Sequence, residues 1–68
     1  MDYTLDKLSE REKEVLLLIT QGNTNKKIGE TLGIAESTVE THRKNIKSKL
    51  QAKHTTDLFR IAHLNNLF

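Results

Sequence analysis

The stretch of sequence that decides the fold is NKKIGETLGIAESTVETHRKNIKSKL, residues 25–50. Ile28 and Leu32 stand four residues apart, the spacing of one face of a helix, and they predict a short helix over residues 25–32. The glycine that follows can adopt the positive φ needed to leave that helix, and a longer, basic helix is predicted over residues 36–50. A short helix, a tight turn with glycine and a longer helix form the helix-turn-helix arrangement.

The longer helix is predicted to be buried on one side and polar on the other. Val39, Ile46 and Leu50 form its apolar stripe. Polar residues three or four apart share the opposite face, namely Ser37, Glu40, Thr41, Lys44, Lys47 and Ser48. A helix of this shape fits the major groove of DNA, where lysine can neutralise phosphates or reach guanine and threonine can contact a base edge. The alternative is a merely solvated amphipathic helix.

Two more helices are predicted outside this stretch, which gives four in all. Ser9 and Glu12, three residues apart, form a capping box, and the helix that they open ends at Gly22. A final helix begins near Thr55 or Thr56. Apolar residues at helical spacing mark the buried sides of both helices, namely Leu8, Val15, Leu16 and Ile19 in the first and Leu58, Phe59, Ile61 and Ala62 in the last.

Length and composition limit the classes of protein to which this chain can belong. Its 68 residues make one domain at most, predicted as a compact all-α domain over residues 8–68 after a loose lead-in over 1–7. Without cysteine it has neither a disulfide nor a thiolate metal site. The longest apolar run, Val15 to Ile19, is far too short to cross a bilayer, and no signal-peptide pattern opens the chain. We therefore expect a cytoplasmic protein without a membrane partner.

Charge is unevenly distributed along the chain, although its net value is only +2. Residues 1–36 carry a net charge of −2, and residues 37–68 carry +4. The second half contains a run of five cations without an intervening acid, namely Arg43, Lys44, Lys47, Lys49 and Lys53. Such asymmetry suggests a polyanionic partner that meets one face of the domain. On charge alone, an ordinary solvated lysine face is an equal alternative.

Two other classes of function were weighed against DNA binding. An enzyme is disfavoured because no two of His42, His54 and His63 form a metal pair at helical spacing, and no carboxylate cluster or glycine-rich phosphate loop accompanies them. We therefore expect no catalytic residue, metal or cofactor. A helical protein-interaction module is the second alternative, because the last helix can present Phe59, Leu67 or Phe68 to a partner. Partner binding by that helix is compatible with DNA binding.

Several motifs, taken in order, resemble the LuxR-type helix-turn-helix domain of the LuxR, GerE, NarL and FixJ superfamily. They are LSEREKEVL at 8–16, Gly22, NKKI at 25–28, LGI at 32–34, STVETH at 37–42, NI at 45–46 and KL at 49–50. The resemblance covers residues 8–68. It implies sequence-specific binding of double-stranded DNA by the effector domain of a bacterial transcription regulator. In this family the domain usually follows a receiver or ligand-binding domain, which would lie outside this chain, but stand-alone members also exist.

The resemblance also implies roles for individual residues. The base-contacting positions of the family correspond to Glu40, Thr41 and Lys44. Its phosphate-contacting positions correspond to Asn25, Lys26, Thr38, Arg43 and Lys47. The fourth helix is implied to form a homodimer on DNA through Phe59, His63 and Leu67. Arg11 and Glu12 are implied to be structural, through the cap and buried polar contacts.

The sequence departs from the family pattern at four positions. Ala35 stands where serine or threonine often caps the recognition helix, Gly29 where alanine is common, and Thr55 where arginine is common. Glu40 replaces a frequent lysine, and its carboxylate can accept a hydrogen bond from cytosine or pair with Lys44 one turn later. These departures bear on sequence preference and phosphate affinity more than on the fold.

Overall fold

Four helices follow one another in the predicted order in a computed structural model that describes residues 5–65. A single turn of 3₁₀ helix, η1, comes first, and no strand occurs among the described residues. The elements are η1 (Leu5–Lys7), α1 (Glu10–Thr20), α2 (Asn25–Leu32), α3 (Glu36–Lys49) and α4 (Thr55–Leu64). The predicted all-α class with four helices is therefore confirmed, including the helix-turn-helix formed by α2 and α3.

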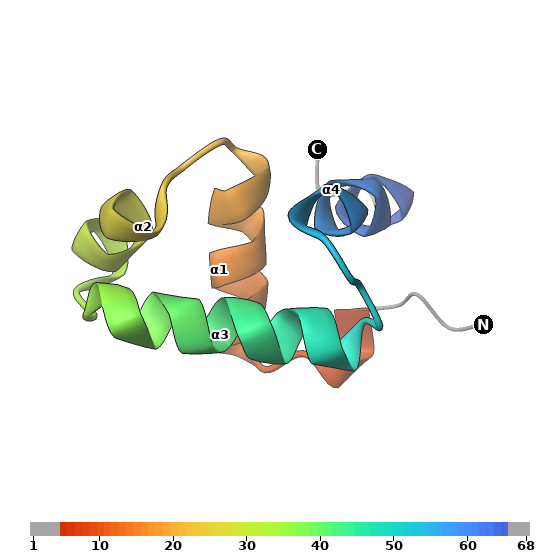
Figure 1. Ribbon diagram of the computed structural model, residues 1–68, viewed down its shortest axis with the longest axis horizontal. Coiled ribbons are helices and arrows are strands. Elements are labelled where there is room, and N and C mark those ends of the chain that lie inside the picture. The colour runs from red at the N-terminus through yellow and green to blue at the C-terminus, as the bar shows by residue number, and fades with distance from the viewer. Residues whose placement is uncertain (1–4, 66–68) are drawn as a thin grey trace.

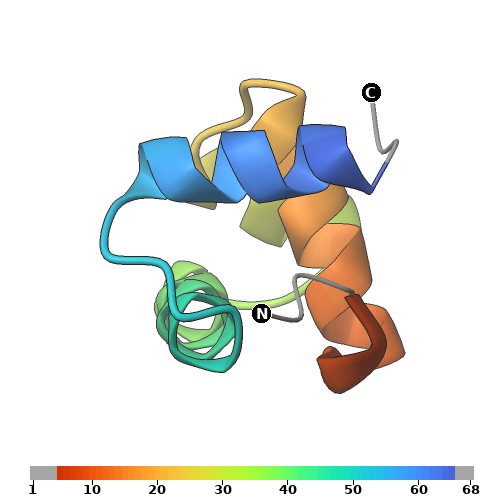
Figure 2. The same ribbon diagram turned by 90° about the vertical axis from the view of Figure 1, so that its right-hand side faces the viewer.

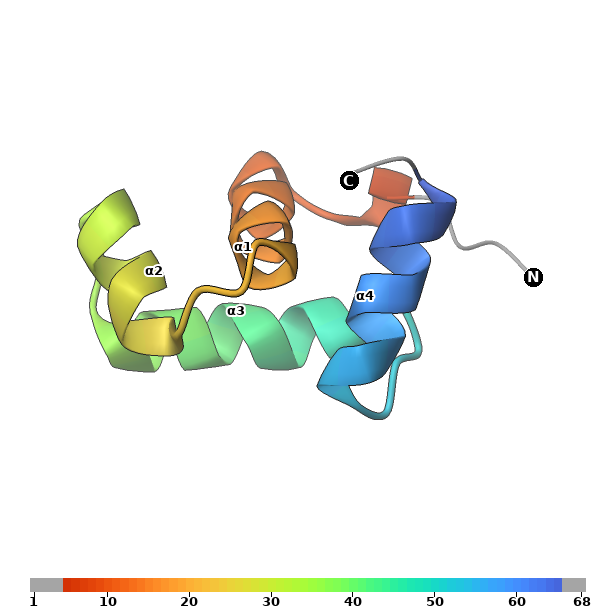
Figure 3. The same cartoon turned by 90° about the horizontal axis from the view of Figure 1, so that it is seen from above.

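The long helix α3 organises the other three (Figure 1). Helix α1 stands across its middle, with α2 at one end and α4 at the other, and the view from above shows the same order (Figure 3). Seen along α3, the helices α1 and α4 occupy two sides of it and leave the remaining sides uncovered (Figure 2). Because the other helices cover only some sides of α3, its remaining face is free to meet a partner (Figure 2).

The core lies where α1 crosses α3 and α4. All the apolar residues predicted for the buried stripes of α1 and α3 are buried, as are those of α4 except Phe59, which is half-buried and packs against them. Ile34, in the turn between α2 and α3, also packs against this core. Burial of apolar side chains stabilises the fold by about 25 cal/mol for each Å² removed from water. Burial of this cluster is therefore the main contribution that holds α3 in place.

The predicted helix ends agree with the structure, but the residue with positive φ that follows α3 was not predicted. Ser9 and Thr24 accept hydrogen bonds from Glu12 and Lys27 backbone N–H groups, and Glu12 completes the predicted capping box. Gly22 and Gly33 adopt the expected positive φ after α1 and α2. After α3 the same role falls to Gln51, whose φ is 56°, a conformation that costs a residue with a side chain more than it costs glycine.

The lead-in differs from the prediction. Residues 5–7, expected to be loose, form η1, and Leu5 packs against the core. The Leu8 backbone N–H donates to the Leu5 carbonyl at 3.0 Å, which closes this turn just before α1 begins. Within residues 5–65, no helix is long and apolar enough to cross a membrane.

An ion pair with a buried carboxylate joins the first and third helices. Oε1 of Glu12, which is only 4% exposed, accepts from Lys49 Nζ at 2.7 Å and from the Ser9 backbone N–H at 2.8 Å. The predicted structural role of Glu12 is therefore confirmed. Arg11, predicted to be structural with it, is instead exposed.

Candidate nucleic-acid interface

The polar face predicted for α3 is the face that remains exposed. Glu40, Thr41 and Lys44 are exposed, whereas Arg43 and Lys47 are half-buried along one edge. Val39 and Ile46 are fully buried on the other side of the helix. The amphipathic pattern therefore holds this face outward, where its side chains can meet a ligand.

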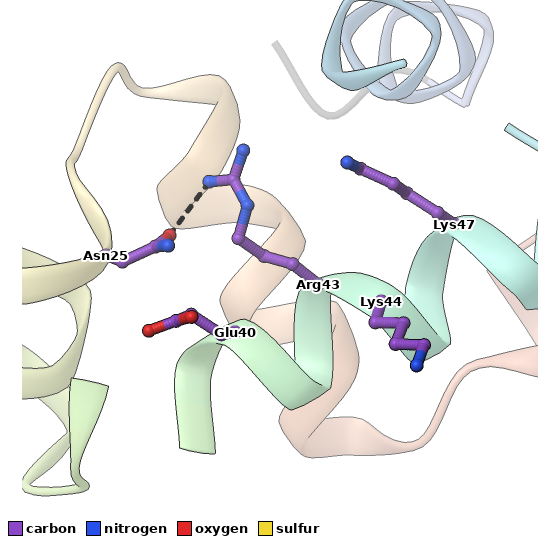
Figure 4. A pocket seen from close by; sticks show the side chains of 5 residues that line it. All are labelled: Asn25, Glu40, Arg43, Lys44 and Lys47. Atoms are coloured by element: carbon purple, nitrogen blue, oxygen red, sulfur yellow. Dashed lines mark hydrogen bonds between the residues drawn. The ribbon is translucent and has the colours of Figure 1, made fainter. Parts of the chain in front are cut away.

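Five of the eight residues predicted to contact DNA line one open hollow on the surface, of about 240 Å³ (Figure 4). Four belong to α3 and one, Asn25, is the first residue of α2. The lining residues are Asn25, Glu40, Arg43, Lys44 and Lys47. Three cations and one carboxylate give the hollow a net positive charge, which suits an anionic ligand such as a phosphate.

The other three predicted contacts lie outside the hollow. Lys26 is exposed in the first turn of α2. Thr38 and Glu40 are two residues apart on α3 and therefore point to different sides of the helix. The Thr41 hydroxyl donates to the Ser37 carbonyl at 3.2 Å, which directs it back to its own helix. The methyl group of Thr41 is then the part that suits contact with a base.

Arg43 has partners that sequence reasoning did not foresee. Its Nη1 donates to Oδ1 of Asn25 at 3.1 Å, and its Nη2 donates to Oγ1 of Thr55 at 3.0 Å. The first of these bonds is drawn in Figure 4. Both partners are half-buried and far from Arg43 in the chain, so no local pattern could have revealed them. Thr55 occupies the position where the family often has arginine.

Glu40 and Lys44 make no ion pair with each other among the contacts of the described residues. Figure 4 shows why, because Lys44 points away from Glu40 and from the rest of the lining. The pairing considered from the sequence is therefore not formed in the DNA-free domain. Both side chains remain available to a ligand.

Other charged groups near α3 serve the fold. Burial raises the pKa of the Glu12 carboxyl, but hydrogen bonds from Lys49 and the Ser9 backbone outweigh it and hold this pKa below the usual 4.5. Lys49 is thereby held on the side of α1, apart from the hollow. At the start of α4, backbone N–H groups of His54 and Lys53 lower the pKa of Asp57 below 3.8.

The residues predicted for dimerisation lie in different environments. Phe59 is half-buried against the core, and His63 is exposed on the same helix. Leu67 lies outside the described residues. Leu64, which sequence reasoning did not single out, is 61% exposed at the end of α4. Among residues 5–65, no three potential metal ligands lie together.

Comparison with known proteins gives a family match over most of the chain. The family model described as "Bacterial regulatory proteins, luxR family" matches residues 6–62. The transcriptional regulatory protein MctR of Rhizobium johnstonii is 53% identical over 57 residues, which are 84% of this chain and 27% of that protein. LiaR of Bacillus subtilis is 48% identical over 62 residues, which are 91% of this chain and 29% of that protein.

A third relative, the transcriptional regulatory protein FixJ of Rhizobium meliloti, is 45% identical over 58 residues, 85% of this chain and 28% of that protein. The chain thus matches little more than a quarter of the length of these relatives. The family model covers all four helices up to Ala62, including the helix-turn-helix and the hollow beside it. The chain therefore belongs to the luxR family of bacterial regulatory proteins and is a DNA-binding effector domain, not an enzyme.

Proposed function

We propose that this domain binds specific sequences of double-stranded DNA by placing α3 in the major groove. Glu40, Thr41 and Lys44 face the bases, and the surrounding residues contact phosphates, namely Asn25, Lys26, Thr38 and Lys47. The observation that carries the proposal is the hollow, in which side chains from two helices combine along a positively charged part of α3. A groove-binding helix needs this combination of base-reading and phosphate-neutralising groups.

We propose further that the domain is the C-terminal effector part of a longer cytoplasmic regulator. It would follow a receiver or ligand-binding domain that lies outside this chain. The relatives support this arrangement, since the chain matches only 27% to 29% of their length. One of them, VraR of Staphylococcus aureus, is named a response regulator protein.

The test begins with selection of bound sequences from a random duplex pool, followed by titration of the selected and a scrambled duplex. Lys44→Ala is expected to weaken binding to the selected duplex by about 1–3 kcal/mol and to change the scrambled duplex little, because a base contact carries specificity. Lys47→Ala is expected to weaken both duplexes alike and to lower the salt slope by about one unit, because a phosphate contact releases counterions.

Lys13→Ala is the matched control for these two variants. Lys13 lies on α1, where it pairs with Glu10 at 3.6 Å, and it does not line the hollow. Its removal should leave both affinities and the salt slope unchanged. If Lys44→Ala and Lys47→Ala also leave binding unchanged, this face of α3 does not enter the groove and the proposal fails.

Glu40 is proposed as a residue that increases specificity at the expense of general affinity. Phosphates repel its carboxylate, whereas cytosine N4 can donate a hydrogen bond to it. Glu40→Lys is therefore expected to bind scrambled duplexes more tightly, with a steeper salt dependence, and to discriminate less well. Glu14→Lys makes the same change of charge on an exposed part of α1 and serves as the control. Unchanged discrimination by Glu40→Lys would leave Thr41 and Lys44 as the reading residues.

We also propose that the domain is mostly monomeric alone and dimerises on DNA through Phe59, His63 and Leu67. Phe59 is already partly used by the core, so α4 offers little apolar surface for a strong interface without DNA. Two half-sites about one helical turn apart would raise the effective concentration of the second copy. Sedimentation at micromolar concentration should show monomers alone and dimers with a two-site duplex. A stable dimer without DNA would contradict this proposal.

A further inference from the structure

The guanidinium of Arg43 connects three helices. From the middle of α3 it reaches Asn25, the first residue of α2, and Thr55, the first residue of α4. All three side chains are half-buried. Helix α4 packs mainly on α1 and has only sparse contact with α3, so the bond from Arg43 to Thr55 links two helices that pack little against each other. A planar guanidinium with diverging N–H groups can hold two acceptors at once, which an ammonium cannot do in the same geometry.

The chemistry of this bond determines the orientation of the Asn25 amide. Arginine only donates hydrogen bonds, so the group of Asn25 that faces it must be the oxygen. Figure 4 shows the amide oxygen turned to Arg43 at the edge of the hollow. The NH₂ group of Asn25 is then left as the free end of the amide. A phosphate oxygen only accepts hydrogen bonds, so an NH₂ group is the end that can bind it.

We propose that Arg43 is a positioning residue for DNA binding rather than a phosphate ligand. It holds the Asn25 amide in the orientation that offers a donor to the DNA backbone, and Thr55 anchors the other end of the guanidinium. This inference rests on the proposed function of the hollow and revises the phosphate-contacting role expected for Arg43. According to this inference, Thr55 supports DNA binding through Arg43 without contacting DNA itself. The family often has arginine at this position.

The test compares Arg43→Lys, Asn25→Ala and the double variant on the selected duplex. Arg43→Lys keeps the positive charge and removes the planar guanidinium, whose diverging N–H groups hold Asn25 and Thr55. We expect each single variant to lose roughly tenfold in affinity, about the value of one hydrogen bond to a charged group. The double variant should lose little more than either single one, because both remove the same oriented donor. The salt slope of Arg43→Lys should equal that of the wild type, because the charge is kept.

A phosphate ligand would give different affinities in these variants, whereas the salt slope of Arg43→Lys would be unchanged in either case because lysine keeps the charge. At a phosphate, lysine would replace arginine and keep most of the affinity. The losses caused by Arg43→Lys and Asn25→Ala would then add in the double variant. Either result overturns the inference. Thr55→Val removes the second anchor without a change of charge and should also weaken binding, so wild-type affinity in this variant overturns the role of Thr55. All titrations are run below the melting temperature of each variant, measured by circular dichroism.

Two further results separate this inference from the proposed function. If the wild type binds no duplex from the pool, the proposed function itself fails. If the wild type binds and Lys44→Ala loses affinity while Arg43→Lys does not, the groove-binding face stands and only the positioning role of Arg43 is wrong.

Discussion

The ion pair of Glu12 and Lys49 offers the most direct test of what holds α3 against α1. Glu12→Gln removes the charge and keeps the shape of the side chain. The carbonyl of the new amide can still accept from the Ser9 backbone N–H, so the capping box survives. What is lost is the ionic attraction to Lys49, whose Nζ lies 2.7 Å from Oε1 of Glu12. The substitution therefore isolates the tertiary contact from the local one.

The expected cost follows from the exposure of the two partners. Removal of one member of a fully buried pair costs about 3–5 kcal/mol, because the other charge is left without compensation. Here the Lys49 side chain is 42% exposed and can turn into water, so that penalty does not arise. The loss approaches that of one hydrogen bond between charged groups, and we expect Glu12→Gln to reduce the free energy of unfolding by about 1–2 kcal/mol at pH 7.

The pH dependence follows from the lowered pKa of Glu12. A carboxyl whose pKa is lower in the folded state stabilises the fold fully above its unfolded pKa, here about the usual 4.5. That stability is lost as the pH falls through the lower pKa of the folded state. The wild type should therefore lose stability on acidification more steeply than Glu12→Gln. The difference between the two proteins should vanish at low pH.

Thermal melts followed by circular dichroism between pH 7 and pH 2 measure both quantities. For a domain of this size, about 1 kcal/mol shifts the melting temperature by roughly 4–8 °C. Glu10→Gln is the matched control on the same helix, because the Glu10 side chain is 91% exposed and its pair with Lys13 is 3.6 Å long. The reasoning is refuted if Glu12→Gln costs no more than Glu10→Gln, or if its cost is the same at every pH.

Three further substitutions probe single turns of the backbone, and thermal melts measure each. Ala35 occupies the N-cap of α3 without a side-chain bond, so Ala35→Ser should stabilise the domain by about 0.5–2 kcal/mol, and a lower midpoint would mean that α3 begins elsewhere. Gly29→Ala should destabilise the domain, because the new methyl group would lie 2.7 Å from the Ile34 carbonyl oxygen. This clash outweighs the gain of about 1 kcal/mol in helix propensity. A higher melting temperature would show that the turn can move. Gln51→Gly should stabilise it by up to about 1 kcal/mol because glycine relieves the positive φ, whereas a loss would show that the Gln51 side chain contributes contacts.

At Gly29, helix propensity and the structure lead to opposite expectations for alanine. Helix propensity alone predicts a gain from alanine at this position, provided that packing leaves room for a methyl group. The structure leaves no such room, because the turn after α2 folds back over Gly29 and brings the Ile34 carbonyl against it. The Ile34 backbone N–H also donates to the Gly29 carbonyl at 2.9 Å, which holds the turn in that position.

Local patterns in the sequence were sufficient to predict the helices and their order. Capping residues such as Ser9 and Thr24 act within three residues, and apolar spacing such as that of Val39 and Ile46 repeats within two turns. Interactions of this range need no knowledge of the rest of the fold. The outer face of α3 could be predicted for the same reason, because burial of one side of a helix leaves the opposite side exposed. The positive φ after α3 was not predicted, because the residue that adopts it is Gln51 and not a glycine.

The partners of the charged side chains were decided by tertiary structure alone. Glu12 meets Lys49, and Arg43 meets Asn25 and Thr55, across separations that no periodicity encodes. In the sequence, Arg43 and Lys47 are two similar cations on one helix, both suited to a phosphate. Arg43 has two acceptors within reach of its guanidinium only because the tertiary structure places the first residues of α2 and α4 beside α3. The sequence supplies the charge, and the packing of the helices decides whether that charge meets the protein or remains available to DNA.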